Sequence, residues 1–169
     1  MMMSKTYLWF VTLLSLATVL GACGIYSFNG ANLGTAKTIK IGFIENKAAI
    51  VEPELSQTLT EALRDKFLSE TGLSIVTNNA DIEVSGFINQ YSTTYLALQG
   101  DEPAKTRLNM SVKLKYVNSL DENTNLEKTF SAFSDFDTNQ ELSAIQDQLN
   151  EDLINQILTD FFNETVNNW

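Results

Sequence analysis

The sequence contains no histidine, a single cysteine and only two prolines among its 169 residues. Without histidine there is no imidazole for acid–base catalysis, for the serine or cysteine nucleophile pairs that depend on it, or for the usual zinc sites. The single cysteine, Cys23, cannot form a disulfide within the chain. We therefore expect a protein that is not an enzyme and that has no metal site, no catalytic residues and no cofactor.

Positive charge is also scarce, because 11 lysines and arginines stand against 21 aspartates and glutamates, giving a formal net charge of −10. Proteins that bind nucleic acids, or that adhere broadly to anionic lipid, obtain much of their affinity from a basic surface. The composition therefore argues against a nucleic-acid partner. One basic cluster remains, and it is either a solvated strand face or a contact for anionic lipid headgroups: Lys105, Arg107, Lys113 and Lys115.

The first 22 residues have the features of a secretory signal peptide. Met1–Lys5 carries one positive charge, and residues 6–22 are mostly apolar and carry none. This run is too short and too lightly flanked for a membrane-spanning helix, which needs roughly 20 apolar residues. We expect residues 1–22 to be removed during export.

The end of the apolar run contains the only cysteine. Leu20-Gly21-Ala22-Cys23 resembles the lipobox of bacterial lipoproteins, in which the cysteine thiol accepts a lipid and the chain is cut before it. We therefore predict a lipid anchor on Cys23. Position 24 is Gly rather than Asp, and among lipoproteins that this one resembles, that residue favours the outer membrane over the inner one.

The rest of the chain fits one domain. Residues 23–37, rich in Gly and Asn, read as an irregular linker, and residues 38–169 as an α+β domain. Alternation of apolar and polar residues predicts four or five strands, within residues 38–45, 73–77, 81–97, 106–118 and 126–137. In the strand at 81–97 we expect Ile82, Val84, Gly86 and Ile88 on one face, and Phe87 and Tyr91 on the other.

Two amphipathic helices complete the prediction. The first begins at Pro53 and ends at Gly72, a site that favours a left-handed residue. The second follows a capping box formed by Thr138 and Glu141, and runs to about residue 163. We expect an antiparallel sheet with both helices packed on one face.

The turn after the strand at 106–118 has the acid and amide spacing of a calcium loop, in Asp121, Asn123 and Asn125. The sixth position is Leu126 rather than Gly and the twelfth is Ala132 rather than Glu. We therefore favour a plain hairpin turn at this point.

Three segments together resemble a known family: Gly24–Phe28 directly after the cysteine, Val51–Leu63, and the ending Phe161–Trp169. They are similar to the lipopolysaccharide-assembly lipoproteins of the LptE family, in their form from Bacteroidetes-like bacteria. The resemblance implies a non-enzymatic protein that assembles with the outer-membrane β-barrel LptD, plugs its lumen and helps lipopolysaccharide reach the cell surface. Relatives proposed to contact lipopolysaccharide use basic residues at loop tips, and here the candidates are Lys105 and Arg107.

Two other functions stay open at this point. The chain could be a periplasm-facing lipoprotein that binds a small ligand or a cell-wall polymer, in which case a deep apolar pocket is expected. It could also be a lipid-anchored hydrolase, which would need perturbed carboxylates converging in a cleft.

Overall fold

The computed structural model describes residues 33–50, 52–96 and 105–166. The predicted signal peptide, Cys23 and Trp169 lie outside the described residues. The elements are β1 (Thr38–Ile41), β2 (Glu45–Asn46), α2 (Leu55–Glu70), β3 (Ser74–Ile75), β4 (Ile82–Leu96), β5 (Lys105–Asn118), the 3₁₀ helix η1 (Glu122–Thr124), β6 (Leu126–Asp137) and α3 (Leu142–Thr165).

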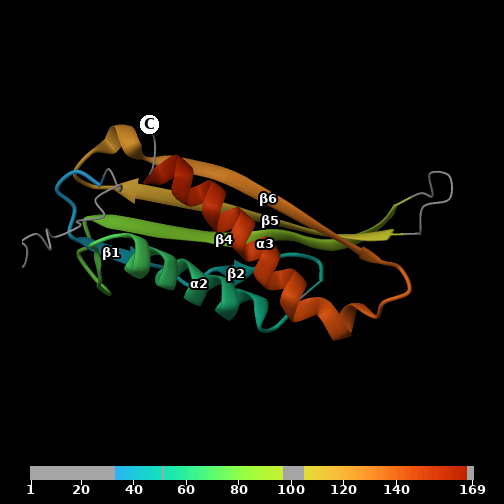
Figure 1. Ribbon diagram of the computed structural model, residues 1–169. Helices are drawn as coiled ribbons and strands as arrows, with labels where there is room; N and C mark the ends of the chain where they lie inside the picture. Colours follow the sequence, from blue (N-terminus) through green and yellow to red (C-terminus); the bar gives the residue numbers. More distant parts are fainter. Residues whose placement is uncertain (1–32, 51, 97–104, 167–169) are drawn as a thin grey trace, which may run out of the picture.

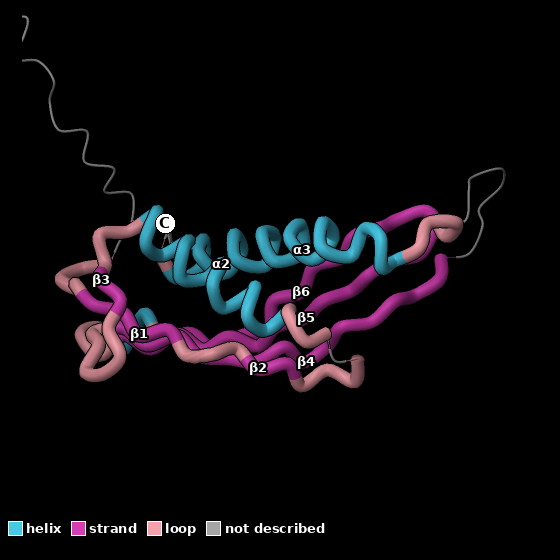
Figure 2. The backbone as a smooth tube through the Cα atoms, turned by 90° about the horizontal axis from the view of Figure 1, so that it is seen from below, coloured by secondary structure: helices cyan, strands magenta, loops and turns pink. Residues whose placement is uncertain are grey.

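The strands form one sheet in the order β3-β1-β4-β5-β6, with β2 also paired to β4. Both helices lie on the same face of this sheet, as Figures 1 and 2 show from two directions. The predicted α+β fold, with two helices covering one face, is confirmed.

The sheet is mixed, whereas we expected antiparallel pairing throughout. β4, β5 and β6 are antiparallel as predicted, but β1 pairs in parallel with both β3 and β4, and β2 pairs in parallel with β4. The reason is connectivity, because α2 carries the chain across the sheet between β1 and β3, and such a crossover produces parallel strands.

The expected first strand at 38–45 is divided into β1 and β2. Between them, the backbone N–H of Ile44 donates to Thr60 Oγ1 on α2 at 3.0 Å, and the Ile44 side chain is fully buried. The chain therefore leaves the ladder briefly to anchor α2 against the sheet.

The start of β1 is fixed by a carboxylate from the residue before β4. Asp81 Oδ2 accepts hydrogen bonds from the N–H groups of Lys37 and Thr38 at 2.9 and 3.0 Å, and from Thr38 Oγ1 at 2.9 Å. These hydrogen bonds, the one from the Lys37 backbone foremost, lower the pKa of Asp81 below its ordinary 3.8. The ionised carboxylate thus holds two strands in register.

A β-bulge in β4 changes the predicted facing of Tyr91. The pairing of β4 with β5 shifts between Ile88 and Gln90, so one residue is inserted and the alternation of faces reverses. Tyr91 is therefore buried on the helix-covered face, at 3% exposure, and the prediction that it lies on the opposite face is wrong. A glycine inside a strand often marks a bulge, but here the bulge lies two residue pairs beyond Gly86.

The buried hydroxyl of Tyr91 joins the sheet to α3. It donates to Asn150 Oδ1 at 2.8 Å and accepts from Gln146 Nε2 at 3.1 Å. Gln146 Nε2 also donates to Glu52 Oε2 at 2.9 Å. Burial is the main reason that the pKa of Tyr91 is raised. The bulge therefore supplies a polar tie in an otherwise apolar interface.

The two helix ends that we predicted from local motifs differ in detail. Pro53 precedes α2 by two residues, and Gly72 is not left-handed. Thr71 ends the helix instead, since its hydroxyl donates to the carbonyl of Phe67 at 2.5 Å and accepts from the N–H of Leu73 at 3.2 Å. The Thr71 side chain thus caps the C-terminal end of α2, a role that we had predicted for Gly72.

The predicted capping box before α3 does not form. Glu141 occupies the N-cap position without a side-chain hydrogen bond, and Thr138 Oγ1 lies 3.2 Å from Thr106 Oγ1 on β5 instead. The segment before the helix is a turn closed on Asp137, whose carbonyl accepts from the N–H of Gln140 at 2.9 Å. This turn displaces the residues that the motif had paired.

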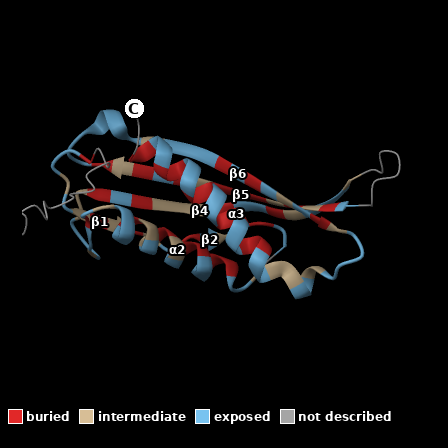
Figure 3. Cartoon of the chain, viewed as in Figure 1, coloured by how far each residue is buried: buried red, intermediate tan, exposed pale blue. Residues whose placement is uncertain are grey.

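Aromatic rings fill the space between the helices and the sheet. The Phe161 ring on α3 lies 6.4 Å from Phe67, 6.4 Å from Tyr116 and 5.6 Å from Phe130, in edge-to-face geometry. Figure 3 shows the buried positions along the helix sides that face the sheet and along alternate strand positions. Phe161 and Phe162 are both buried, so the last turns of α3 belong to the core.

Candidate functional site on the open face of the sheet

The face of the sheet that the helices leave uncovered, called here the open face, consists of the strand residues that alternate with the buried ones. It is polar, and its side chains are largely paired across neighbouring strands. Its main members are Lys40, Glu83, Lys105, Arg107, Asn109, Ser111, Lys113, Lys115, Glu127, Thr129, Ser131, Phe133, Asp135 and Asp137.

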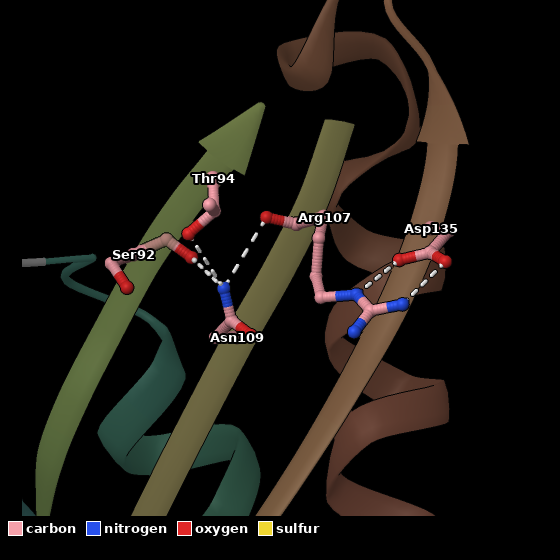
Figure 4. Close-up of polar contacts among 5 residues, drawn as sticks. All are labelled: Ser92, Thr94, Arg107, Asn109 and Asp135. Carbon is pink, nitrogen blue, oxygen red and sulfur yellow. Dashed lines mark hydrogen bonds and ion pairs between the residues drawn. The ribbon is translucent and has the colours of Figure 1, made fainter. Parts of the chain in front are cut away.

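Arg107 has the most ordered environment on this face. Its Nε and Nη2 atoms donate to Asp135 Oδ1 and Oδ2 at 2.6 and 2.9 Å, a two-point contact between β5 and β6 (Figure 4). The guanidinium also lies over the Phe133 ring at 3.7 Å. Hydrogen bonding raises the pKa of Arg107 and lowers the pKa of Asp135. The charge of Arg107 is thus largely satisfied within the molecule.

Neighbouring rungs of the sheet are held in the same way. Asn109 Nδ2 donates to the Ser92 carbonyl at 3.4 Å and to Thr94 Oγ1 at 3.3 Å (Figure 4). The hydroxyls of Ser111 and Ser131 lie 2.8 Å apart. These contacts make the centre of the face uncharged and hydrogen-bonded.

Two further ion pairs flank this centre. Lys113 Nζ lies 2.7 Å from Glu127 Oε1, and Lys40 Nζ lies 2.8 Å from Glu83 Oε1. The hydrogen bond from Lys113 is the largest cause of a lowered pKa at Glu127. All four side chains are more than a third exposed, so each pair contributes little to folding and mainly neutralises the surface.

The charges of the molecule are separated between its two layers. The open face carries five cations and four carboxylates, whereas α3 contains no lysine or arginine and five acidic residues: Asp147, Glu151, Asp152, Asp160 and Glu164. The negative charge therefore lies on the helical side, and the basic cluster that we noted in the sequence lies entirely on the open face.

The structure brings the two predicted lipopolysaccharide contacts together. Lys105 and Arg107 share the open face at the end of the β4–β5 pair that extends beyond the helices (Figure 1). Lys105 is exposed, and among the described residues no carboxylate lies within ion-pair distance of it, whereas Arg107 is bound to Asp135. Asp135 was not predicted as a partner of Arg107, because the two residues become neighbours only when β5 and β6 pair.

The turn at residues 119–125 uses its acid and amide groups internally. Asp121 Oδ1 accepts from the N–H of Asn123 at 3.1 Å, and Asn125 Oδ1 accepts from the N–H of Asn118 at 2.7 Å. This agrees with a turn rather than a calcium loop. In residues 33–50, 52–96 and 105–166 no three His, Cys, Asp or Glu side chains are grouped as metal ligands would be.

The described part of the chain contains no apolar helix of membrane-spanning length. The amphipathic α2 and α3 instead bury their apolar sides against the sheet.

Comparison with known proteins places this arrangement in a family. The family model described as LptE, lipopolysaccharide-assembly, matches residues 36–163. Comparison with curated proteins found no match.

The chain is similar to several solved structures. The hypothetical protein CT253 from Chlamydia trachomatis has a TM-score of 0.54 and 9% identity, over 76% of this chain and 98% of that one. Protein XCC0632 from Xanthomonas campestris has a TM-score of 0.52 and 8% identity, over 78% of this chain and 83% of that one. The rare lipoprotein B from Shewanella oneidensis has a TM-score of 0.48 and 11% identity, over 76% of this chain and 90% of that one.

These identities are low, so the structural likeness concerns the fold alone. The family model, in contrast, spans most of the sequence and all of the strands and helices except the last residues of α3. The chain belongs to the LptE family of lipopolysaccharide-assembly proteins.

Proposed function

We propose that this protein is an outer-membrane lipoprotein that assembles with an LptD-like β-barrel, plugs its lumen and assists lipopolysaccharide transport to the cell surface. The observation that carries the proposal is the family match over residues 36–163. Membership is also consistent with a role in assembly rather than catalysis. In this function the protein works through its folded surface.

The open face supports a role inside a barrel. The lumen of a membrane barrel is polar, so a protein enclosed there needs a surface of hydrogen-bonding groups without unpaired charge. The centre of the open face has that character, with the Ser111–Ser131 hydroxyl pair and Asn109 set between the Arg107–Asp135 and Lys113–Glu127 ion pairs.

The lipid anchor is part of the same proposal. A lipid on Cys23 would hold the domain at the membrane through residues 24–37, where a barrel could enclose it. Each buried methylene contributes about 0.8 kcal/mol, so several acyl chains hold a protein firmly. The mature chain with Cys23 replaced by serine, exported behind a signal peptide of a non-lipidated protein, should be absent from the membrane fraction without a change in its fold.

Direct contact with lipopolysaccharide is assigned to Lys105 and Arg107. Lys105 is the stronger candidate, because Arg107 already binds Asp135 through two hydrogen bonds. A phosphate group could still approach the remaining nitrogen of Arg107, since the guanidinium is planar and offers five donors.

The experiment is affinity isolation of the tagged, full-length protein from detergent-solubilised membranes, followed by mass spectrometry. We expect an LptD-like barrel to be recovered in near-equal amount. The Cys23→Ser variant serves as the control for localisation, and recovery of no barrel with the wild-type protein would count decisively against the proposal.

A further inference from the structure

The two edges of the sheet differ greatly in length. One ends in β3, which has two residues, and the other is β6, which has twelve and pairs on one side only, with β5. Native proteins usually shorten, cover or charge an exposed edge, because its unpaired N–H and C=O groups can accept another strand. Within the described residues, β6 is a long strand that pairs with no strand other than β5 (Figure 1).

The hydrogen-bonding pattern shows which residues of β6 present these groups. The N–H of Ser119 donates to the Asp81 carbonyl, so odd-numbered residues of β5 bond to β4 and even-numbered ones bond to β6. With the register that places Val112 opposite Phe130, the even-numbered residues of β6 bond to β5. The odd-numbered residues therefore direct their N–H and C=O groups outward.

No backbone–backbone hydrogen bond within the described residues reaches these outward groups from Glu127 to Asp135. The first part of the edge is protected differently from the rest. Lys128 has a core-facing position, and its Nζ lies 2.5 Å from Glu164 on α3, which places two charges beside the edge. From Thr129 to Ser134 the strand is uncharged, so this stretch is the part suited to pairing.

Charge disfavours antiparallel pairing of two copies in the two registers that are centred on this uncharged stretch. Antiparallel self-pairing centred on Ser131 would place Glu127 opposite Asp135 of the other copy, and pairing centred on Ala132 would place it opposite Asp137. Like charges directly opposite on neighbouring strands are destabilising. The edge instead fits a segment with small or apolar residues in its middle and no acidic side chain opposite Glu127 or Asp135.

We infer that the outward edge of β6, from Thr129 to Ser134, binds an extended segment of the barrel protein by strand addition, a contact that rests on the proposed function. The strands of a closed barrel already satisfy one another. The segment must therefore come from a loop or a terminal stretch of the barrel protein, and main-chain hydrogen bonds would hold it against β6.

Thr129→Pro tests the contact with little other change. Thr129 is exposed, its N–H points outward, and no hydrogen bond involves its side chain, so the substitution removes one outward donor while sparing the ladder to β5. Thr129→Ala is the matched control, since it shortens the same side chain and keeps the N–H. Thermal melting of both purified variants checks that each remains folded.

The readout is the amount of barrel recovered with each tagged full-length variant. We expect Thr129→Pro to lower recovery at least about tenfold, because proline removes a donor and its ring obstructs the adjoining strand, whereas Thr129→Ala leaves recovery unchanged. Equal recovery with the two variants would overturn the inference and leave the proposed function standing. If the wild-type protein recovers no barrel, both fall.

A second measurement does not depend on a proline. Photo-crosslinking residues placed separately at Thr129 and Phe133 should attach to barrel residues four positions apart in one segment, as strand pairing requires, while one at Gln57 on the exposed side of α2 should not. Cross-links to a second copy of this chain, or to scattered barrel residues, would contradict strand addition.

Discussion

Replacing Tyr91 with phenylalanine should destabilise the domain markedly, although it removes a single oxygen atom. The Tyr91 hydroxyl is buried and holds Asn150 Oδ1 at 2.8 Å and Gln146 Nε2 at 3.1 Å. Asn150 is itself buried, so its side-chain oxygen Oδ1 would be left without this hydrogen-bond donor. A buried polar group left unsatisfied costs about 1–3 kcal/mol. Gln146 keeps its hydrogen bond to Glu52, so the loss of its contact with Tyr91 adds less to the destabilisation.

We therefore expect Tyr91→Phe to lower the free energy of unfolding by about 2 kcal/mol, which is a large part of the stability of a typical domain. The measurement is urea unfolding of the mature chain carrying Cys23→Ser, with the change taken from the midpoint at constant slope.

Tyr95→Phe is the matched control on the same strand. Tyr95 is 80% exposed and has no hydrogen bond through its hydroxyl in the described structure, so its loss should change stability by less than about 0.5 kcal/mol. Equal effects of the two substitutions would refute the reasoning, since they would mean that the bulge does not place Tyr91 in the core.

Four further substitutions test other parts of the fold. Gly86→Ala should cost about 1–3 kcal/mol in urea unfolding, because a Cβ there would overlap the Lys113 carbonyl oxygen, whereas Gly72→Ala, with nothing within 4 Å and no left-handed backbone, should be neutral or stabilising. Asp81→Asn should lower the free energy of unfolding at neutral pH. The variant should then lose less stability than the wild-type protein when the pH is lowered. The lowered pKa of Asp81 means that its contribution is full above the unfolded value near 3.8 and is lost as the pH falls through the lower folded value. Unfolding midpoints across that range measure the difference. Phe161→Ala should lower the free energy of unfolding by about 3–5 kcal/mol, since it empties the centre of the aromatic cluster. An unchanged urea-unfolding midpoint would contradict that packing.

Hydrophobic periodicity predicted the elements well wherever a long segment had one buried face. The strand at 126–137 has the predicted bounds, and the strand at 106–118 differs by one residue. The same alternation accounts for Phe133, which lies on the face opposite the core and is 52% exposed. These features depend on side chains that are close together in sequence, so the pattern alone contains them.

Features set by distant contacts were not predictable in this way. The bulge that turns Tyr91 inward depends on the register between β4 and β5, and the parallel pairing of β1 depends on the path of α2. The predicted capping box failed because Thr138 lies against Thr106, 32 residues earlier. In each case a tertiary contact prevailed over a local motif.

The candidate site was predicted in part. The basic cluster was visible in the sequence, but its pairing was not, because Arg107 and Asp135 meet only when β5 and β6 align. Cys23 and its lipid remain predictions from the sequence. The separation of charge between α3 and the open face likewise becomes visible only once the two layers are assembled.

The most direct test of the account is depletion of this protein in its own cells, with the assembled barrel and surface lipopolysaccharide measured together. If the protein assembles with an LptD-like barrel, the folded barrel and surface lipopolysaccharide should both decrease, and the wild-type gene should restore both. Normal levels of folded barrel and of surface lipopolysaccharide after complete depletion would contradict the central claim.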